Sequence, residues 1–178
     1  MKIPALSSSR QSLMAAGALI GLTASAHAAE AQASAQLLIK APVERVWQLL
    51  VDVDRWPSWN HSVESAILEG AVASGSVFVW KSQGFTVRST IQTVEPRHRL
   101  TWTGAAFGTR AFHSWEFEVV DGGVLVTTAE TFDGWLPWLL RAMMQRKLDD
   151  TLPGWLASLK VAAEAPAPPS DGPSTQSH

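Results

Sequence analysis

The chain has 178 residues, a length typical of one domain rather than several. Its formal net charge is −2 and it contains no long run of basic residues, which argues against a nucleic-acid partner. There is no cysteine, so disulfides, thiolate catalysis and cysteine metal sites are excluded. Hydrophobic residues make up 46% of the chain, enough to form the core of a globular domain.

The first 28 residues have the pattern of a secretory signal. Lys2 and Arg10 precede an apolar stretch at 13–22, and small residues follow it as far as Ala28. A charged start, a short apolar middle and a small-residue end are the three parts of such a signal. We therefore expect an exported protein, periplasmic or secreted, with cleavage near Ala28. An uncleaved membrane anchor is the alternative, although about 20 apolar residues are needed to span a bilayer.

The rest of the chain divides into three parts. Residues 29–33 form a short leader, and residues 34–164 carry the hydrophobic periodicity of a folded domain. Residues 165–178 are rich in proline and serine, which predicts a disordered tail.

The domain opens with a predicted strand at 35–40, followed by a helix that begins at Pro42. Proline suits the first position of a helix, and the next apolar residues recur at helical spacing. A second short helical turn is expected at 52–56, ended by Pro57.

From Val63 onward the apolar residues alternate with a period of two, which indicates strands. Short turns rich in glycine separate these strands, so an antiparallel meander is expected. The predicted strands are 63–68, 77–82, 85–94, 100–103, 111–120 and 124–132.

A long helix is predicted from Trp135 to Glu164, because its apolar residues again recur at helical spacing. Proline inside a helix removes one backbone hydrogen bond, so we expect Pro153-Gly154 to interrupt or kink this helix.

Five short motifs follow each other in an order and spacing that resemble the SRPBCC superfamily, which includes START domains and polyketide cyclase-like proteins. The motifs are APVERVW at 41–47, DRWPSWN at 54–60, VEP at 94–96, LTWTG at 100–104 and HSWEF at 113–117. The resemblance implies an α+β helix-grip fold. In that fold a curved seven-stranded antiparallel sheet, two short helices and a long C-terminal helix enclose a cavity. Different members of the superfamily use the cavity for lipids, sterols, hormones or polyketides.

Strand alternation then predicts which side chains face this cavity. We expect an aromatic wall with a few polar groups, completed by two methionines of the last helix and a tryptophan of the second short helix. The predicted ligand-binding residues are Trp59, Phe78, Trp80, Phe85, Val87, Ser89, Trp102, His113, Trp115, Phe117, Thr128, Glu130, Met143 and Met144.

The glycine pair Gly122-Gly123 suits a two-residue hairpin turn. That turn would place His113 opposite Phe132, with Glu130 pointing inward and diagonal to His113. Diagonal neighbours lie about 7 to 8 Å apart, within reach of long side chains or one bridging water. The pair could orient a ligand, transfer protons, or be a buried polar contact that fixes the strand register.

Two functions compete on this basis. The leading one is an exported protein that binds a hydrophobic small molecule or lipid without catalysis. The other is an enzyme of the cyclase, dehydratase or hydrolase kind, in which His113 and Glu130 transfer protons. An interaction module with a vestigial cavity is a third possibility. No cofactor is expected, and the histidines lack metal-ligand spacing.

The start of the last helix is unusually apolar. Trp135, Leu136 and Trp138 exceed what one buried helix face needs, which suggests a gate or a peripheral contact with a membrane. Core packing or a dimer contact are the alternatives.

Overall fold

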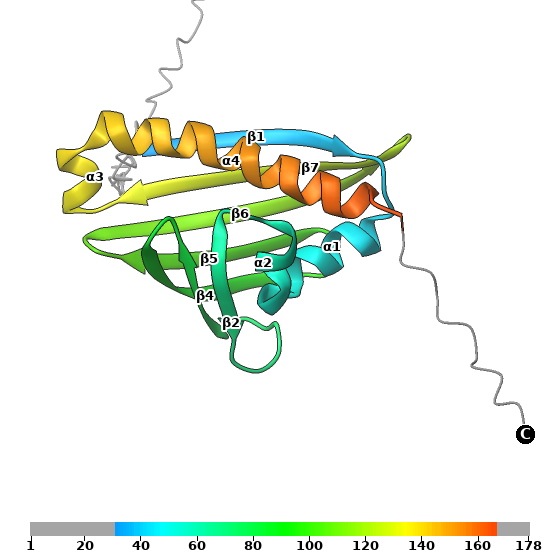
Figure 1. Ribbon diagram of the computed structural model, residues 1–178, viewed down its shortest axis with the longest axis horizontal. Coiled ribbons are helices and arrows are strands. Elements are labelled where there is room, and N and C mark those ends of the chain that lie inside the picture. The colour runs from blue at the N-terminus through cyan, green and yellow to red at the C-terminus, as the bar shows by residue number, and fades with distance from the viewer. Residues whose placement is uncertain (1–30, 167–178) are drawn as a thin grey trace, which may run out of the picture.

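The computed structural model describes residues 31–166, and Figure 1 shows their arrangement. The predicted signal, the start of the leader and most of the predicted tail lie outside these residues. Within residues 31–166, no helix is both long and apolar enough to cross a membrane.

Seven strands form one antiparallel sheet in the order β1-β7-β6-β5-β4-β3-β2, as predicted. Every strand from β2 to β7 is paired with its neighbour in sequence, and β1 closes the row by pairing with β7. The strands are β1 Ala31–Ile39, β2 Val63–Leu68, β3 Val77–Ser82, β4 Phe85–Glu95, β5 Arg99–Ala106, β6 Thr109–Val120 and β7 Gly123–Asp133.

Helices cover the concave face of the sheet. The long helix α4 crosses this face above β1 and β7, while α1 and α2 lie beside it near the far end of α4 (Figure 1). The helical segments are α1 Val43–Val51, the 3-10 turn η1 Val53–Arg55, α2 Trp56–Trp59, α3 Trp135–Leu139 and α4 Arg141–Glu164. This arrangement confirms the helix-grip fold.

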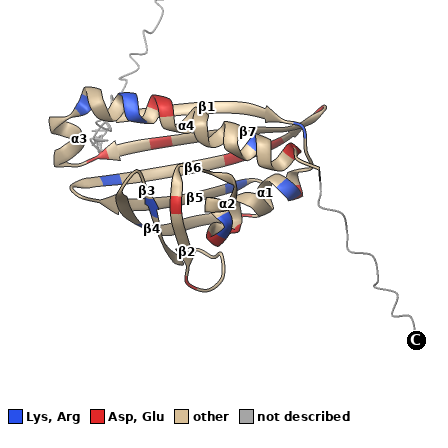
Figure 2. Ribbon diagram, in the orientation of Figure 1, with Lys and Arg blue, Asp and Glu red and all other residues tan. Residues whose placement is uncertain are grey.

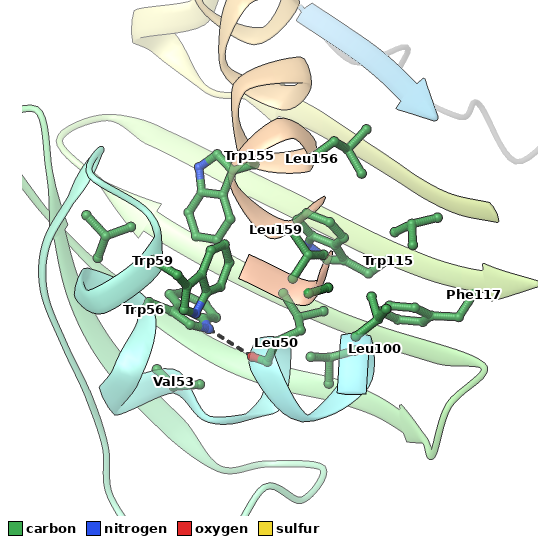
Figure 3. Close-up of a cluster of buried hydrophobic side chains, with 14 of the residues drawn as sticks. Leu50, Val53, Trp56, Trp59, Leu100, Trp115, Phe117, Trp155, Leu156 and Leu159 are labelled. Atoms are coloured by element: carbon green, nitrogen blue, oxygen red, sulfur yellow. Dashed lines mark hydrogen bonds between the residues drawn. The ribbon is translucent and has the colours of Figure 1, made fainter. Parts of the chain in front are cut away.

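Tryptophans make up much of the core where α1, α2 and α4 meet the sheet (Figure 3). The ring of Trp155 from α4 makes edge contacts with Trp56 and Trp59, at centroid distances of 5.1 and 5.9 Å. Trp56 is fully buried, and its indole N–H donates to the carbonyl of Leu50 at 2.8 Å. Each large ring is therefore held in a defined orientation, which aromatic edge contacts favour.

The ends of several elements differ from the prediction. Strand β1 begins at Ala31 instead of residue 35, because Ala31 pairs with Phe132 and packs against α4. The predicted leader is therefore partly strand. Pro57 lies in the first turn of α2 and does not end a helix. Proline is tolerated there because the first N–H groups of a helix have no intrahelical partner.

The last helical segment is interrupted at a different point from the one predicted. α4 runs without a break from Arg141 to Glu164 with Pro153 inside it, and the interruption falls at Leu140, between α3 and α4. Pro153 is exposed, whereas Leu152, Trp155 and Leu156 around it are buried. Burial of that face holds the helix together across the missing hydrogen bond, because packing outweighs local propensity in protein helices.

Candidate functional site

The strand register places the predicted wall residues of β3 to β7 on the concave face. Trp102 of β5 lies opposite His113 of β6, which in turn lies opposite Glu130 of β7. Two residues further along β6 and β7, Trp115 lies opposite Thr128. Side chains that point to one face alternate along each strand, so the other predicted residues of these strands share this face.

The predicted register of the β6–β7 hairpin was wrong by two residues. The turn consists of Asp121 and Gly122, so Val120 pairs with Gly123 and His113 pairs directly with Glu130. Gly123 belongs to the strand, where a β-carbon would come within 2.2 Å of the carbonyl oxygen of Ile39. A shift of two residues keeps every side chain on its face, which is why Glu130 still points inward.

His113 is buried and has a polar partner on each ring nitrogen. Its Nε2 lies 2.7 Å from the hydroxyl oxygen of Thr128, and that hydroxyl donates to the carbonyl of Ser114 at 3.1 Å. A hydroxyl has only one hydrogen to donate, so the hydrogen in the first contact belongs to Nε2. Thr128 thus fixes which nitrogen of His113 is protonated.

The other ring nitrogen faces a carboxylate. Nδ1 of His113 lies 3.5 Å from Oε1 of Glu130, longer than a hydrogen bond but within the range of an ion pair. If Nε2 carries the ring proton, the lone pair of Nδ1 faces a lone pair of the Glu130 carboxylate. A further proton on either group would turn this contact into an attractive one. The geometry therefore directs Nδ1 of His113 at the carboxyl group of Glu130.

Aromatic rings flank the histidine. The ring of Trp102 lies 4.7 Å from that of His113, and the ring of Trp115 stacks on it at 5.5 Å with an interplanar angle of 11°. The two rings hold the imidazole in place from both sides. The Nε1–H of Trp115 is buried and finds no acceptor among residues 31–166.

Burial divides the concave face into two halves. Toward α1 and α2 it is filled, because Trp102, Trp115 and Thr128 expose 3% of their surface or less. The predicted residues Trp59, Phe78, Ser89, His113 and Phe117 are likewise buried. In this structure these residues contact each other and leave no surface for a ligand.

Toward α3 the concave face is more open. Trp80 and Val87 are half-buried, Phe85 is exposed, and the side chain of Glu130 keeps 11% of its surface accessible. Between them, Gly104 of β5 lies opposite Ala111 of β6 and Ser89 of β4. Gly104 is buried under its neighbours, because a β-carbon there would lie 3.2 Å from the hydroxyl oxygen of Ser89 and 3.3 Å from the Val87 side chain.

The start of α4 borders this open half. Met143 is exposed, whereas Met144 is buried with Ala31 and Leu148 under the helix. Lys147 reaches across to the β3–β4 hairpin, where its ammonium group contacts the side-chain oxygen of Gln83 at 2.8 Å and lies 5.1 Å from the centre of the Phe85 ring. This exposed contact joins helix and sheet at the rim of the concave face.

Sequence reasoning missed Gly104, Ala111 and Lys147. Alternation places Gly104 on the same face as Trp102, and Ala111 on the same face as His113, so both small residues could have been found. The contact of Lys147 with the hairpin could not, since it depends on how α4 lies across the sheet.

Other surfaces offer weaker candidates. A hollow of about 470 Å³ lies on the convex face, lined among others by Thr101, Thr103, Phe112 and Ser114. It contains no buried charged group that would orient a ligand. Within residues 31–166, no three histidine, aspartate or glutamate side chains are grouped to hold a metal ion.

Comparison with known families gives one match. The family described as polyketide cyclase / dehydrase and lipid transport matches residues 30–164, which include every described strand and helix from β1 to α4. No curated protein matches the chain.

Several solved structures share the fold. A hypothetical protein from Helicobacter pylori is 18% identical with a TM-score of 0.67, and the match covers 89% of this chain and 99% of that one. A START superfamily protein from Mycobacterium smegmatis is 12% identical with a TM-score of 0.65, covering 75% and 97%. An aromatase/cyclase from Streptomyces sp. R1128 is 14% identical with a TM-score of 0.67, covering 75% and 93%. At these identities the likeness concerns the fold.

Proposed function

Because this chain belongs to the polyketide cyclase / dehydrase and lipid transport family, we propose that it binds a hydrophobic small molecule or lipid on the α3 half of the concave face, without catalysis. The observation that carries this proposal is the position of Glu130. Its carboxyl group lies where the filled half of the face meets the open half, and it is the polar group of the His113 pair that remains accessible.

The surroundings of Glu130 suit an apolar ligand. The small, half-buried Ala111 of β6 lies opposite Phe132 of β7, and Val87 lies two positions from Ser89 on β4, so apolar side chains line this part of the concave face. Binding sites for small molecules are mostly apolar, with a few polar groups that fix the orientation of the ligand. A ligand with one hydroxyl or carbonyl oxygen and an otherwise hydrophobic body would match this arrangement.

Native mass spectrometry of the protein purified from its own cell tests the proposal. We expect a bound small molecule, and we expect Ala111→Phe to abolish it because the ring would occupy the space above β6. Ala105→Phe is the matched control, since Ala105 is exposed on the opposite face of the neighbouring strand. A wild-type protein that is purified empty and takes up no hydrophobic probe would contradict ligand binding.

A second function is favoured by the contact between His113 and Glu130. A buried pair that holds one proton could transfer it to or from a carbon next to a carbonyl, as a cyclase or dehydratase requires. After the bound molecule is identified, its hydrogen exchange in deuterated water measures this activity. Enzyme-dependent exchange that is lost in Glu130→Gln, while the molecule stays bound, would identify a catalyst; no exchange would leave a binding protein.

We also propose that the protein acts outside the cytoplasm. The apolar stretch 13–22 and the small residues before Ala28 support export, and cleavage at Ala28 would leave every described strand and helix in the mature protein. The intact mass of the protein recovered from the exported fraction should correspond to residues 29–178. A mass corresponding to the whole chain would indicate a retained anchor.

A further inference from the structure

We propose that the α3 end of the molecule is a docking surface for a bilayer that contains anionic phospholipid. The surface, here called the α3 tip, combines exposed apolar side chains with a basic surround. It is distinct from the ligand-binding proposal, because only Met143 of its residues borders the open half of the concave face. Its exposed apolar members are Phe107, Trp135, Trp138, Leu139, Leu140 and Met143.

Two elements distant in sequence build the α3 tip. Phe107 lies in the β5–β6 hairpin turn, and its ring contacts that of Trp135 from α3 at a centroid distance of 5.9 Å. The Trp135 ring packs so closely on Gly108 that a β-carbon there would come within 2.3 Å of it. The tip is therefore a packed surface rather than a row of loose side chains.

The hairpin exposes its aromatic residue at a conformational cost. Phe107 has a positive φ of 27°, a region that favours glycine and asparagine over aromatic residues. Such a conformation costs about 1 to 3 kcal/mol. Yet 74% of the Phe107 surface faces solvent, so core packing does not offset that cost. The two-residue turn between β5 and β6 and the contact with Trp135 hold this conformation, and the rest of the ring is left facing solvent.

Of the α3 segment predicted to contact a membrane, only part is available. Trp135 and Trp138 expose more than half of their surface, whereas Leu136 packs inward against Ala31, Met144 and Leu148, and Pro137 is buried. Leu139 and Leu140 take the place of Leu136 on the exposed side. Tryptophan is favoured at the level of lipid headgroups, where one part of the ring system is apolar and the N–H is hydrated.

The charge around the α3 tip favours an anionic partner. The segments 104–112 and 133–147 hold four basic residues, Arg110, Arg141, Arg146 and Lys147, against the single acidic residue Asp133, although the whole chain is net acidic. Figure 2 shows the basic positions of β6 and α4 near α3. A second copy would bring like charges together across a symmetric contact, whereas anionic headgroups neutralise them.

The position of the first described residue is consistent with docking through the α3 tip. Ala31 packs with Leu136 of α3 and pairs with Phe132, so the described chain begins beside the α3 tip.

Fluorescence quenching by vesicles tests the inference with the protein as purified after expression of residues 1–178. The vesicles contain phosphatidylglycerol with brominated acyl chains, which quench tryptophans that enter the bilayer. We expect quenching in the wild type and its loss in Trp135→Ser/Trp138→Ser, because Trp56, Trp102, Trp115 and Trp155 are buried. Trp138→Ser alone serves as a second variant, since Trp138 is more exposed and does not pack on Gly108.

Two comparisons decide the outcome. Arg141→Gln/Arg146→Gln should weaken binding to anionic vesicles about fivefold per residue, since each basic residue near such a surface contributes about that factor. Arg55→Gln/Arg97→Gln and Ile67→Ser, exposed elsewhere, should change nothing. The proposal would be overturned if wild type and Trp138→Ser were quenched equally, or if the wild type bound vesicles of phosphatidylcholine alone as well as anionic vesicles. It would also be overturned if the protein were a dimer that Trp138→Ser dissociates. Retention of the native ligand by these variants keeps this result separate from ligand binding.

Discussion

At the scale of single residues, Thr128 determines the chemistry available to His113. Its hydroxyl occupies Nε2 and is itself tied to the backbone of β6, so Nδ1 is directed at Glu130. A positioning residue of this kind should be detectable without any substrate, because the protonation of the ring nitrogens can be observed directly.

Thr128→Val should remove the fixed protonation pattern. The variant keeps the shape of the side chain but leaves the buried Nε2–H without an acceptor, which costs about 1 to 3 kcal/mol in unfolding free energy. Nitrogen-15 spectra of the His113 ring should show Nε2 protonated in the wild type and in Thr128→Ser, and a mixture in Thr128→Val. Unchanged ring spectra and unchanged stability in the valine variant would show that Thr128 does not position His113.

The sequence allowed the faces of these residues to be predicted but not their distances. His113 and Glu130 were placed on one face because alternation depends only on whether the register is even or odd. Their direct pairing was missed, since the choice between Asp121-Gly122 and Gly122-Gly123 as the turn depends on the approach of Ile39 to Gly123. The division of the concave face into a filled half and an open half could not be predicted from the sequence either, because it depends on how the tryptophans pack.

At the scale of elements, α4 shows which local signals tertiary structure overrides. The number, order and type of the strands followed from periodicity, since each period leaves one apolar face to be buried. The predicted interruption at Pro153 is absent, because Leu152, Trp155 and Leu156 anchor the helix on both sides of it. The break at Leu140 had no comparable signal, since it arises where α3 turns to pack on the β5–β6 hairpin.

Gly154→Ala should stabilise the protein. Gly154 is exposed in the interior of α4, and nothing lies within 4 Å of the position that a β-carbon would take. Alanine in a helix interior is about 1 kcal/mol more favourable than glycine. Denaturant unfolding should show that gain. Gly84→Ala is the matched control: it is equally open but has a φ of +80°, so alanine should destabilise the protein there. A loss of stability in Gly154→Ala would mean that α4 is not regular at this point.

At the scale of the whole molecule, α4 is tied to the rest of the fold at both ends. Near α3, Lys147 contacts the β3–β4 hairpin. At the opposite end, Glu164 accepts a hydrogen bond from the backbone N–H of Lys40 at 2.7 Å and is paired with Lys160, and Arg45 of α1 donates to the carbonyl of Ala162. A helix held at its two ends, and packed on the core by Leu152, Trp155 and Leu156 between them, keeps the concave face in one shape.

The contacts of Glu164 predict a dependence of stability on pH. The hydrogen bond from Lys160 and that from the backbone of Lys40 lower the pKa of the Glu164 carboxyl below its ordinary value of 4.5. A carboxyl whose pKa is lower in the folded state contributes stability that is fully present above its unfolded pKa and is lost as the pH falls through its folded pKa. Urea midpoints measured from neutral pH to below 4.5 should therefore fall less steeply in Glu164→Gln than in the wild type. Glu118→Gln, an exposed glutamate of β6, should follow the wild-type curve, and overlapping curves for all three proteins would show that the end of α4 is not held by Glu164.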